Sequence, residues 1–144
     1  MIGMLIALLS GALMSIQGVF NTGVTKQTSL WVATGFVQLT AFLVCIVAWF
    51  FTGRESISAL SEVQPKYLLL GGVIGAFITM TVVKSMGDLG PASATLLIVI
   101  AQLSVSYLIE LFGLFGADKA DFSWRKLLGM AIAVAGIFIF QRSK

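Results

Sequence analysis

Three polar residues recur every four positions in an apolar stretch of the second half of the chain. Gln102, Ser106 and Glu110 would share one face of an α-helix, with Tyr107 beside them. A carboxyl group inside a membrane-spanning helix is costly unless it is paired, hydrated or protonated, so Glu110 is a candidate for taking up and releasing a proton or binding a substrate. In the alternative interpretation, Glu110 lies near enough to the helix end to reach water and has no such role.

A second polar face is expected near the amino terminus. Ser10, Met14, Gln17 and Asn21 are spaced by three or four residues, and Gln38 lies in the next apolar stretch. Amide side chains in such a stretch either hydrogen-bond between packed helices or contact a substrate. Both interpretations are open for Gln17, Asn21 and Gln38.

These residues are carried by a chain whose composition requires lipid. Of the 144 residues, 58% are hydrophobic and 10% are charged, and the mean hydropathy is +1.03. Soluble domains are about a quarter charged, so this chain has too few charges to cover a water-exposed surface. The net charge of +3 is spread singly between apolar runs, which argues against a nucleic-acid partner.

The composition also limits the chemistry that the chain can perform. It has no histidine and only one cysteine, Cys45, so neither a His/Cys metal site nor an intrachain disulfide is expected. The spans contain no nucleophile paired with a base and no carboxylate cluster. We therefore expect no cofactor and no enzymatic activity.

Five apolar segments are long enough to cross a bilayer, for which about 20 residues suffice. The sequence thus predicts an all-α membrane protein with a single five-helix domain over residues 1–144. The predicted spans are 1–20, 31–52, 67–86, 92–115 and 124–140. Gly71 and Gly75 in the third span, and Gly129 and Gly136 in the fifth, are interpreted as helix-packing positions.

The basic residues give almost no instruction about orientation in the membrane. With five spans, one face would hold five of them and the other four: Arg54, Lys66, Lys119, Arg125 and Lys126 against Lys26, Lys84, Arg142 and Lys144. The excess of Lys and Arg that normally fixes the cytoplasmic side is therefore nearly absent. Insertion in both orientations becomes possible, and in an antiparallel pair Lys84 of one copy could approach Glu110 of the other.

Several motifs resemble the YdcZ family of the drug/metabolite transporter superfamily, nearly end to end. The family more usually has Gly and Asp where this chain has Ala101 and Glu110, but the acidic position is kept. The resemblance is carried by Gln17-Gly18-Val19-Phe20-Asn21, by Gly71-Gly72-Val73-Ile74-Gly75-Ala76, by Leu89-Gly90-Pro91-Ala92, by Ala101-Gln102-Leu103, by Ile109-Glu110-Leu111-Phe112-Gly113 and by Leu127-Leu128-Gly129.

The resemblance implies a multi-pass protein of the bacterial inner membrane that exports small molecules. It also implies one half of a ten-span transporter made of two inverted five-span repeats, with members that occur alone, in pairs or fused. A second, inverted copy would complete a pathway with a site near the midplane of the membrane.

The leading hypothesis is therefore a secondary transporter that works as an antiparallel homodimer. Its partners would be the lipid bilayer, a second copy of the chain and a small-molecule substrate. Glu110 would couple protons to substrate, and the central cavity would be lined by Gln17, Asn21, Gln38, Gln102, Ser106 and Tyr107. The alternative is a non-transporting scaffold or accessory subunit that binds a partner membrane protein through its glycine-rich faces.

Overall fold

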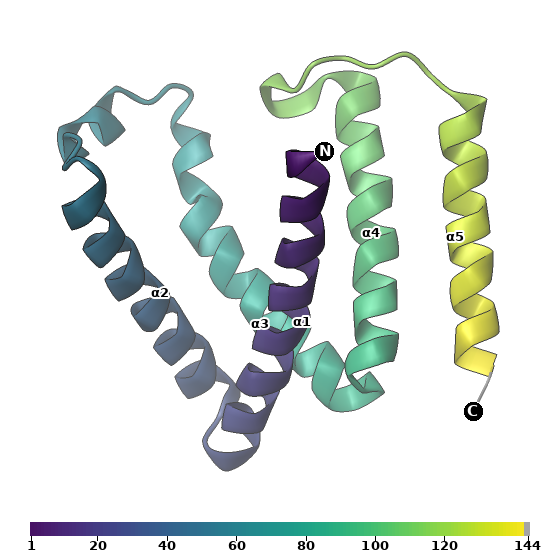
Figure 1. Ribbon diagram of the computed structural model, residues 1–144, viewed down its shortest axis with the longest axis horizontal. Coiled ribbons are helices and arrows are strands. Elements are labelled where there is room, and N and C mark those ends of the chain that lie inside the picture. The colour runs from purple at the N-terminus through teal and green to yellow at the C-terminus, as the bar shows by residue number, and fades with distance from the viewer. Residues whose placement is uncertain (143–144) are drawn as a thin grey trace. The chain divides into compact units, whose positions relative to one another are not determined.

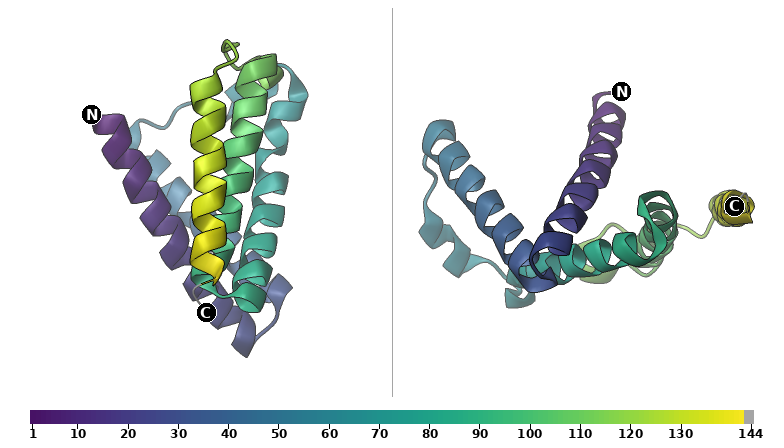
Figure 2. Two further views of the ribbon diagram at one scale, coloured as in Figure 1. Left: turned by 90° about the vertical axis from the view of Figure 1, so that its right-hand side faces the viewer. Right: turned by 90° about the horizontal axis from the view of Figure 1, so that it is seen from below.

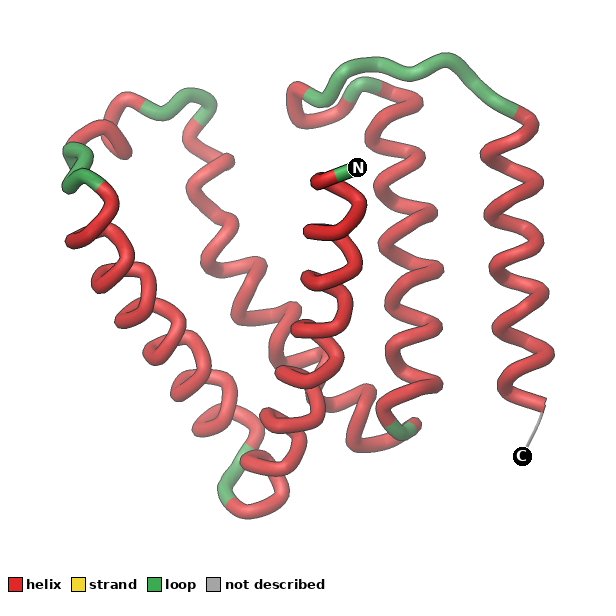
Figure 3. The backbone as a smooth tube through the Cα atoms, in the orientation of Figure 1, coloured by secondary structure: helices red, strands yellow, loops and turns green. Residues whose placement is uncertain are grey.

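The computed structural model describes residues 1–142 and is built from helices, with no strand in that range (Figure 1, Figure 3). The α-helices are α1 (Ile2–Gln27), α2 (Leu30–Thr52), α3 (Gly71–Leu89), α4 (Pro91–Phe112) and α5 (Trp124–Arg142). The short 3-10 helices are η1 (Ile57–Glu62), η2 (Lys66–Leu70) and η3 (Leu114–Gly116). The predicted all-α class is confirmed. Lys144, which entered the charge comparison, lies outside the described residues.

Four helical segments are long and apolar enough to cross a membrane: Ile2–Gln27, Leu30–Thr52, Lys66–Leu89 and Pro91–Phe112. Most of their large apolar side chains are exposed, for example Leu5 at 66% and Phe42 at 60%. Apolar surface on this scale needs lipid around it. Helix α5 begins at Trp124, as predicted, and has 19 residues, but its crossing of the membrane as a fifth span stays a prediction.

The first helix is longer than the predicted span 1–20, because it continues to Gln27. The Thr22 hydroxyl donates a hydrogen bond to the Gly18 carbonyl within the helix, and the hydroxyl of Thr28, directly after it, donates to the Val24 carbonyl. The turn to α2 is confined to Thr28 and Ser29, and the Ser29 hydroxyl accepts from the Val32 amide as an N-cap. Asn21 therefore lies inside α1, one turn after Gln17.

The chain forms two compact units, Met1–Asp88 and Leu89–Lys144. In the first unit, buried side chains gather where α1, α2 and α3 come together, and α1 and α2 diverge from there (Figure 1, Figure 2). A Cβ placed on Gly18 of α1 would lie 2.5 Å from Met86 Sδ of α3, so Gly18 leaves open the space that the end of this methionine side chain occupies. The other buried residues of this unit are Ala33, Thr34 and Val83.

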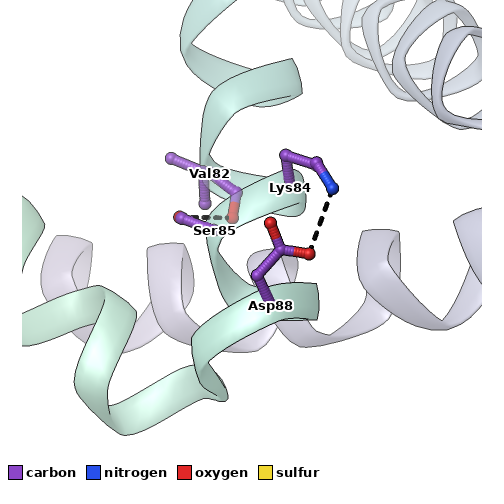
Figure 4. A network of polar contacts seen from close by, with 4 residues as sticks. All are labelled: Val82, Lys84, Ser85 and Asp88. Carbon is purple, nitrogen blue, oxygen red and sulfur yellow. Dashed lines mark hydrogen bonds and ion pairs between the residues drawn. The ribbon is translucent and has the colours of Figure 1, made fainter.

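An ion pair closes the last turns of α3. Lys84 Nζ lies 3.1 Å from Asp88 Oδ1, one helical turn later, and both side chains are exposed. Ser85 donates its hydroxyl hydrogen bond to the Val82 carbonyl beside them (Figure 4). Lys84 thus has a carboxylate partner on its own helix, so its position does not require an acid from another copy.

In the second unit α4 and α5 lie side by side (Figure 1). The interface is apolar, and it encloses a void of only about 30 Å³. Its lining comes from Val99, Ile100, Leu103 and Ser104 of α4 and from Met130, Ala133, Val134 and Ile137 of α5. The face of α4 that packs on α5 is thereby fixed.

Candidate functional site

An open groove of about 580 Å³ runs along α1 beside α2. Its lining is Ser10, Leu13, Met14, Ile16, Gln17, Phe20, Asn21 and Val37. All four residues of the polar face expected on the first span line this groove. The lining carries no charged side chain, so the groove suits a mainly apolar ligand that also accepts or donates hydrogen bonds.

Gln38 lies elsewhere, although its neighbour Val37 lines the groove. The Gln38 amide nitrogen would be 3.8 Å from a Cβ placed on Gly75 of α3. The Gln38 side chain is partly buried, and it extends from α2 towards this glycine of α3. The structure thus brings Gln17 and Asn21 together and places Gln38 at a helix contact.

The amides of the spans lack protein partners, whereas many hydroxyls have them. Thr22, Thr40 and Thr79 each donate to the carbonyl four residues earlier in their own helix. Among the described residues no hydrogen bond is found for four amide side chains, those of Gln17, Asn21, Gln38 and Gln102. In hydrocarbon such groups are costly, so water, a ligand or another chain must reach them.

Helix α4 ends earlier than predicted, at Phe112 rather than at position 115. Gly113 has a φ of +63°, a left-handed conformation that glycine adopts without strain, and its amide donates to the carbonyls of Glu110 and Ile109. The linker folds back on this end, because the Ala120 amide donates to the Glu110 carbonyl at 2.9 Å. Glu110 therefore lies in the last turn of α4.

The side chain of Glu110 is paired with a lysine from the next helix. Lys126 Nζ of α5 lies 3.0 Å from Glu110 Oε2, and both side chains are about half exposed, at 50% and 48%. The same ammonium group lies 5.5 Å from the centroid of the Tyr107 ring. Glu110, Lys126 and Tyr107 form one cluster, which we call the α4–α5 cluster.

Tyr107 is the buried anchor of this cluster. It is 8% exposed, and its hydroxyl oxygen accepts a hydrogen bond of 3.1 Å from the Ser123 amide. Ser123 directly precedes α5, and its carbonyl accepts from Leu127 in the first turn. Tyr107 thus fixes where α5 begins, which in turn places Lys126 beside Glu110.

Gln102 and Ser106 lie on a different face of α4 from the residues that pack on α5, and both are exposed. Within this unit the predicted polar face therefore divides. Glu110 joins the α4–α5 cluster with Tyr107, whereas Gln102 and Ser106 have no hydrogen-bond partner in the part of the chain that the structure describes.

Sequence reasoning missed Lys126 and Ser123 as parts of the site. Lys126 was counted only as a charge at the membrane surface, and the periodicity of one helix says nothing about the next. The available signal was the short linker over 113–123, which joins a helix ending near an acid to a helix beginning with two basic residues, Arg125 and Lys126.

The glycines interpreted as packing positions differ in what surrounds them. A Cβ on Gly71, Gly129 or Gly136 would meet no atom within 4 Å among the described residues, whereas one on Gly75 would meet Gln38. Gly18, outside that set, makes the closest approach. A packing role for Gly71, Gly129 and Gly136 stays a prediction that needs another chain.

No group of three or more potential metal ligands occurs among residues 1–142. Cys45 is a free, exposed thiol on α2. The candidate site therefore consists of amide, hydroxyl, aromatic and ion-pair chemistry.

Comparison with protein-family models shows that residues 2–139 match the family described as "Putative inner membrane exporter, YdcZ". No curated protein matches the chain. No solved structure matches it either.

Proposed function

This chain belongs to the YdcZ family of inner-membrane exporters, and we propose that it is a secondary transporter that exports a small organic molecule as an antiparallel dimer. The five helices α1 to α5 would each cross the membrane and form one half of an inverted-repeat transporter. A transporter, not an enzyme, is what the family description supports.

The observation that carries the proposal is the groove on α1. It presents two unpartnered amides, Gln17 and Asn21, on an otherwise mostly apolar wall of a span. In a helix that faced only lipid, these two amides would be removed from water with no hydrogen bond to compensate for it. A hydrated pathway, or a substrate with apolar surface and hydrogen-bonding groups, accounts for both the amides and the apolar lining.

The dimer is supported by what a single copy lacks. The groove is open, and Gln102 and Ser106 are exposed on α4 without partners. An inverted second copy would cover such surfaces and complete a site between two repeats. The nearly even division of basic residues between the two sides allows the chain to insert in both orientations, as an antiparallel dimer requires.

Glu110 is the proposed coupling residue, through exchange of a proton for substrate at its carboxylate. It is the one acidic residue in the four helices that qualify as spans on length and composition, other than Asp88 at the end of α3. With α4 as a span, the last turn that carries Glu110 would lie close to the membrane surface, within reach of protons from water.

The test is proton flux in liposomes that contain the purified protein, driven by each member of a broad panel of small organic molecules. We expect substrate-dependent flux for the wild type. Replacement of both groove amides, Gln17→Leu and Asn21→Leu, should abolish it, while Gln27→Leu on the same helix but outside the groove should not. Transport unaffected by the double replacement would refute the groove as the pathway.

The alternative function, a scaffold or accessory subunit of another membrane protein, is favoured by the glycines that meet no neighbour in one copy. It predicts no flux for any member of the panel, together with copurification of a different membrane protein. The transporter proposal predicts flux from the purified chain alone.

A further inference from the structure

The ion pair between Glu110 and Lys126 joins the last turn of α4 to the first turn of α5. Both side chains are about half exposed, so the pair lies at the surface of the structure and not among its buried groups. The contact between α4 and α5 is already made by buried groups, including Tyr107 and Ile137. What Lys126 adds to this contact is a positive charge beside the carboxylate of Glu110.

In a membrane, a lone carboxylate near hydrocarbon is expensive, and a neighbouring cation reduces that cost. Lys126 supplies the cation from the first turn of α5, at 3.0 Å. Another lysine, Lys119, also lies near this end of α4, since its Cβ would be 3.4 Å from a Cβ added to Gly113. Lys119 makes no ion pair with Glu110 among the described residues. Lys126 is therefore the cation that neutralises Glu110.

The Lys126 ammonium group also has a second interaction partner, the ring of Tyr107. It lies 5.5 Å from the centroid of the Tyr107 ring, within the range of a cation–π interaction. Tyr107 is fixed by burial and by its bond from the Ser123 amide. If the carboxylate loses its charge, Lys126 can stay against the ring or turn its flexible stem towards water.

We propose that Lys126 is a resident counter-ion of Glu110, a positioning residue that an incoming proton or organic cation must displace from the carboxylate. When a proton arrives, an O–H bond forms on Glu110, the ion contact with Lys126 is lost, and the net charge of the pair rises from zero to +1. The inference rests on the proposed coupling role of Glu110, but the pair can be tested without transport.

The test uses dicyclohexylcarbodiimide, an apolar reagent that reacts with the protonated form of a carboxyl group in or near a membrane. The full-length protein in liposomes is treated at fixed pH, and labelling of Glu110 is followed over time by mass spectrometry of its peptide. We expect slow labelling in the wild type and a several-fold faster rate in Lys126→Met, because the carboxylate then loses its cation. Lys126→Arg should restore the slow rate.

The matched control is Lys84→Met, which removes the lysine of the other ion pair, with Asp88 on α3, and should leave the rate at Glu110 unchanged. If Lys126→Met does not fold, as judged by circular dichroism, the exchanged pair Glu110→Lys with Lys126→Glu serves instead. In this exchanged protein the carboxylate at position 126 should label slowly. It should label much faster in the variant that combines Lys126→Glu with Glu110→Gln.

The proposal is overturned if Lys126→Met labels Glu110 at the wild-type rate, or if Lys126→Arg labels as fast as Lys126→Met. Failure of the transporter proposal would look different. In that case the labelling rates would follow the pattern expected here, while the liposomes show no substrate-dependent flux.

Discussion

Lys126 Nζ lies 3.0 Å from Glu110 Oε2, so the carboxyl group of α4 finds its counter-ion sixteen residues later on α5. Three further contacts tie the same two helix ends together: the Ala120 amide to the Glu110 carbonyl, the Ser123 amide to the Tyr107 hydroxyl, and Lys126 over the Tyr107 ring. The end of α4 and the start of α5 therefore form one structural unit around Glu110.

Tyr107→Phe should loosen this unit without removing its ring. The Ser123 amide would lose its acceptor in a partly buried position, at a cost of about 1 kcal/mol in the free energy of unfolding. Hydrogen exchange followed by mass spectrometry should show faster exchange over 114–123 and unchanged exchange in α1 and α2. Unchanged exchange in the linker would contradict the anchoring role of Tyr107.

Gly18→Leu should destabilise the first unit, because a Cβ at this position already comes within 2.5 Å of Met86 Sδ. Forcing a large side chain into a packed contact costs about 1–3 kcal/mol. Thermal unfolding in detergent, followed by circular dichroism, should show a lower Tm. Gly11→Leu on the same helix, where a Cβ meets nothing within 4 Å, is the control and should unfold at the wild-type temperature.

The groove on α1 should be open to water while neighbouring positions at the same depth face lipid. In a Cys45→Ser background, Gln17→Cys and Asn21→Cys should react with a membrane-impermeant maleimide in intact membranes. Val19→Cys lies between them along the helix but outside the groove and should react much more slowly. Equal, slow reaction at all three positions would mean that lipid fills the groove.

Sequence reasoning predicts correctly those features of the fold that depend on the residues of a single helix. The all-α class and the start of α5 at Trp124 follow from apolar length and charge, and the face shared by Ser10, Met14, Gln17 and Asn21 follows from helical spacing. These properties depend on neighbouring positions in one segment, so periodicity is enough to reach them.

Sequence reasoning is less successful at helix ends, where the residue types are compatible with both a helix and a loop. Residues 21–27 are rich in Thr and Gly and lie outside the predicted first span, yet α1 continues through them, with the Thr22 hydroxyl bonded to the Gly18 carbonyl of the same helix. The predicted fourth span ends three residues after the end of α4, because the sequence does not distinguish Gly113, which adopts a left-handed turn, from the many other glycines of the chain.

Contacts between helices were the least accessible to sequence reasoning. The pairing of Lys126 with Glu110 depends on the path of the linker, which is set by Tyr107 and the Ser123 amide. Gly18, rather than Gly71, Gly129 or Gly136, is the glycine on which an added Cβ would lie nearest to another residue, the Met86 side chain. A pattern along one helix cannot identify which residues of another helix it will meet.

The most direct test of the central claim is the topology of the carboxyl terminus, measured with two reporters fused there, one active only in the cytoplasm and one only outside. We predict signal from both in the same host, because an antiparallel dimer of one chain requires insertion in both orientations. Signal from one reporter alone would contradict the self-sufficient antiparallel dimer. The inverted half would then have to come from a different chain.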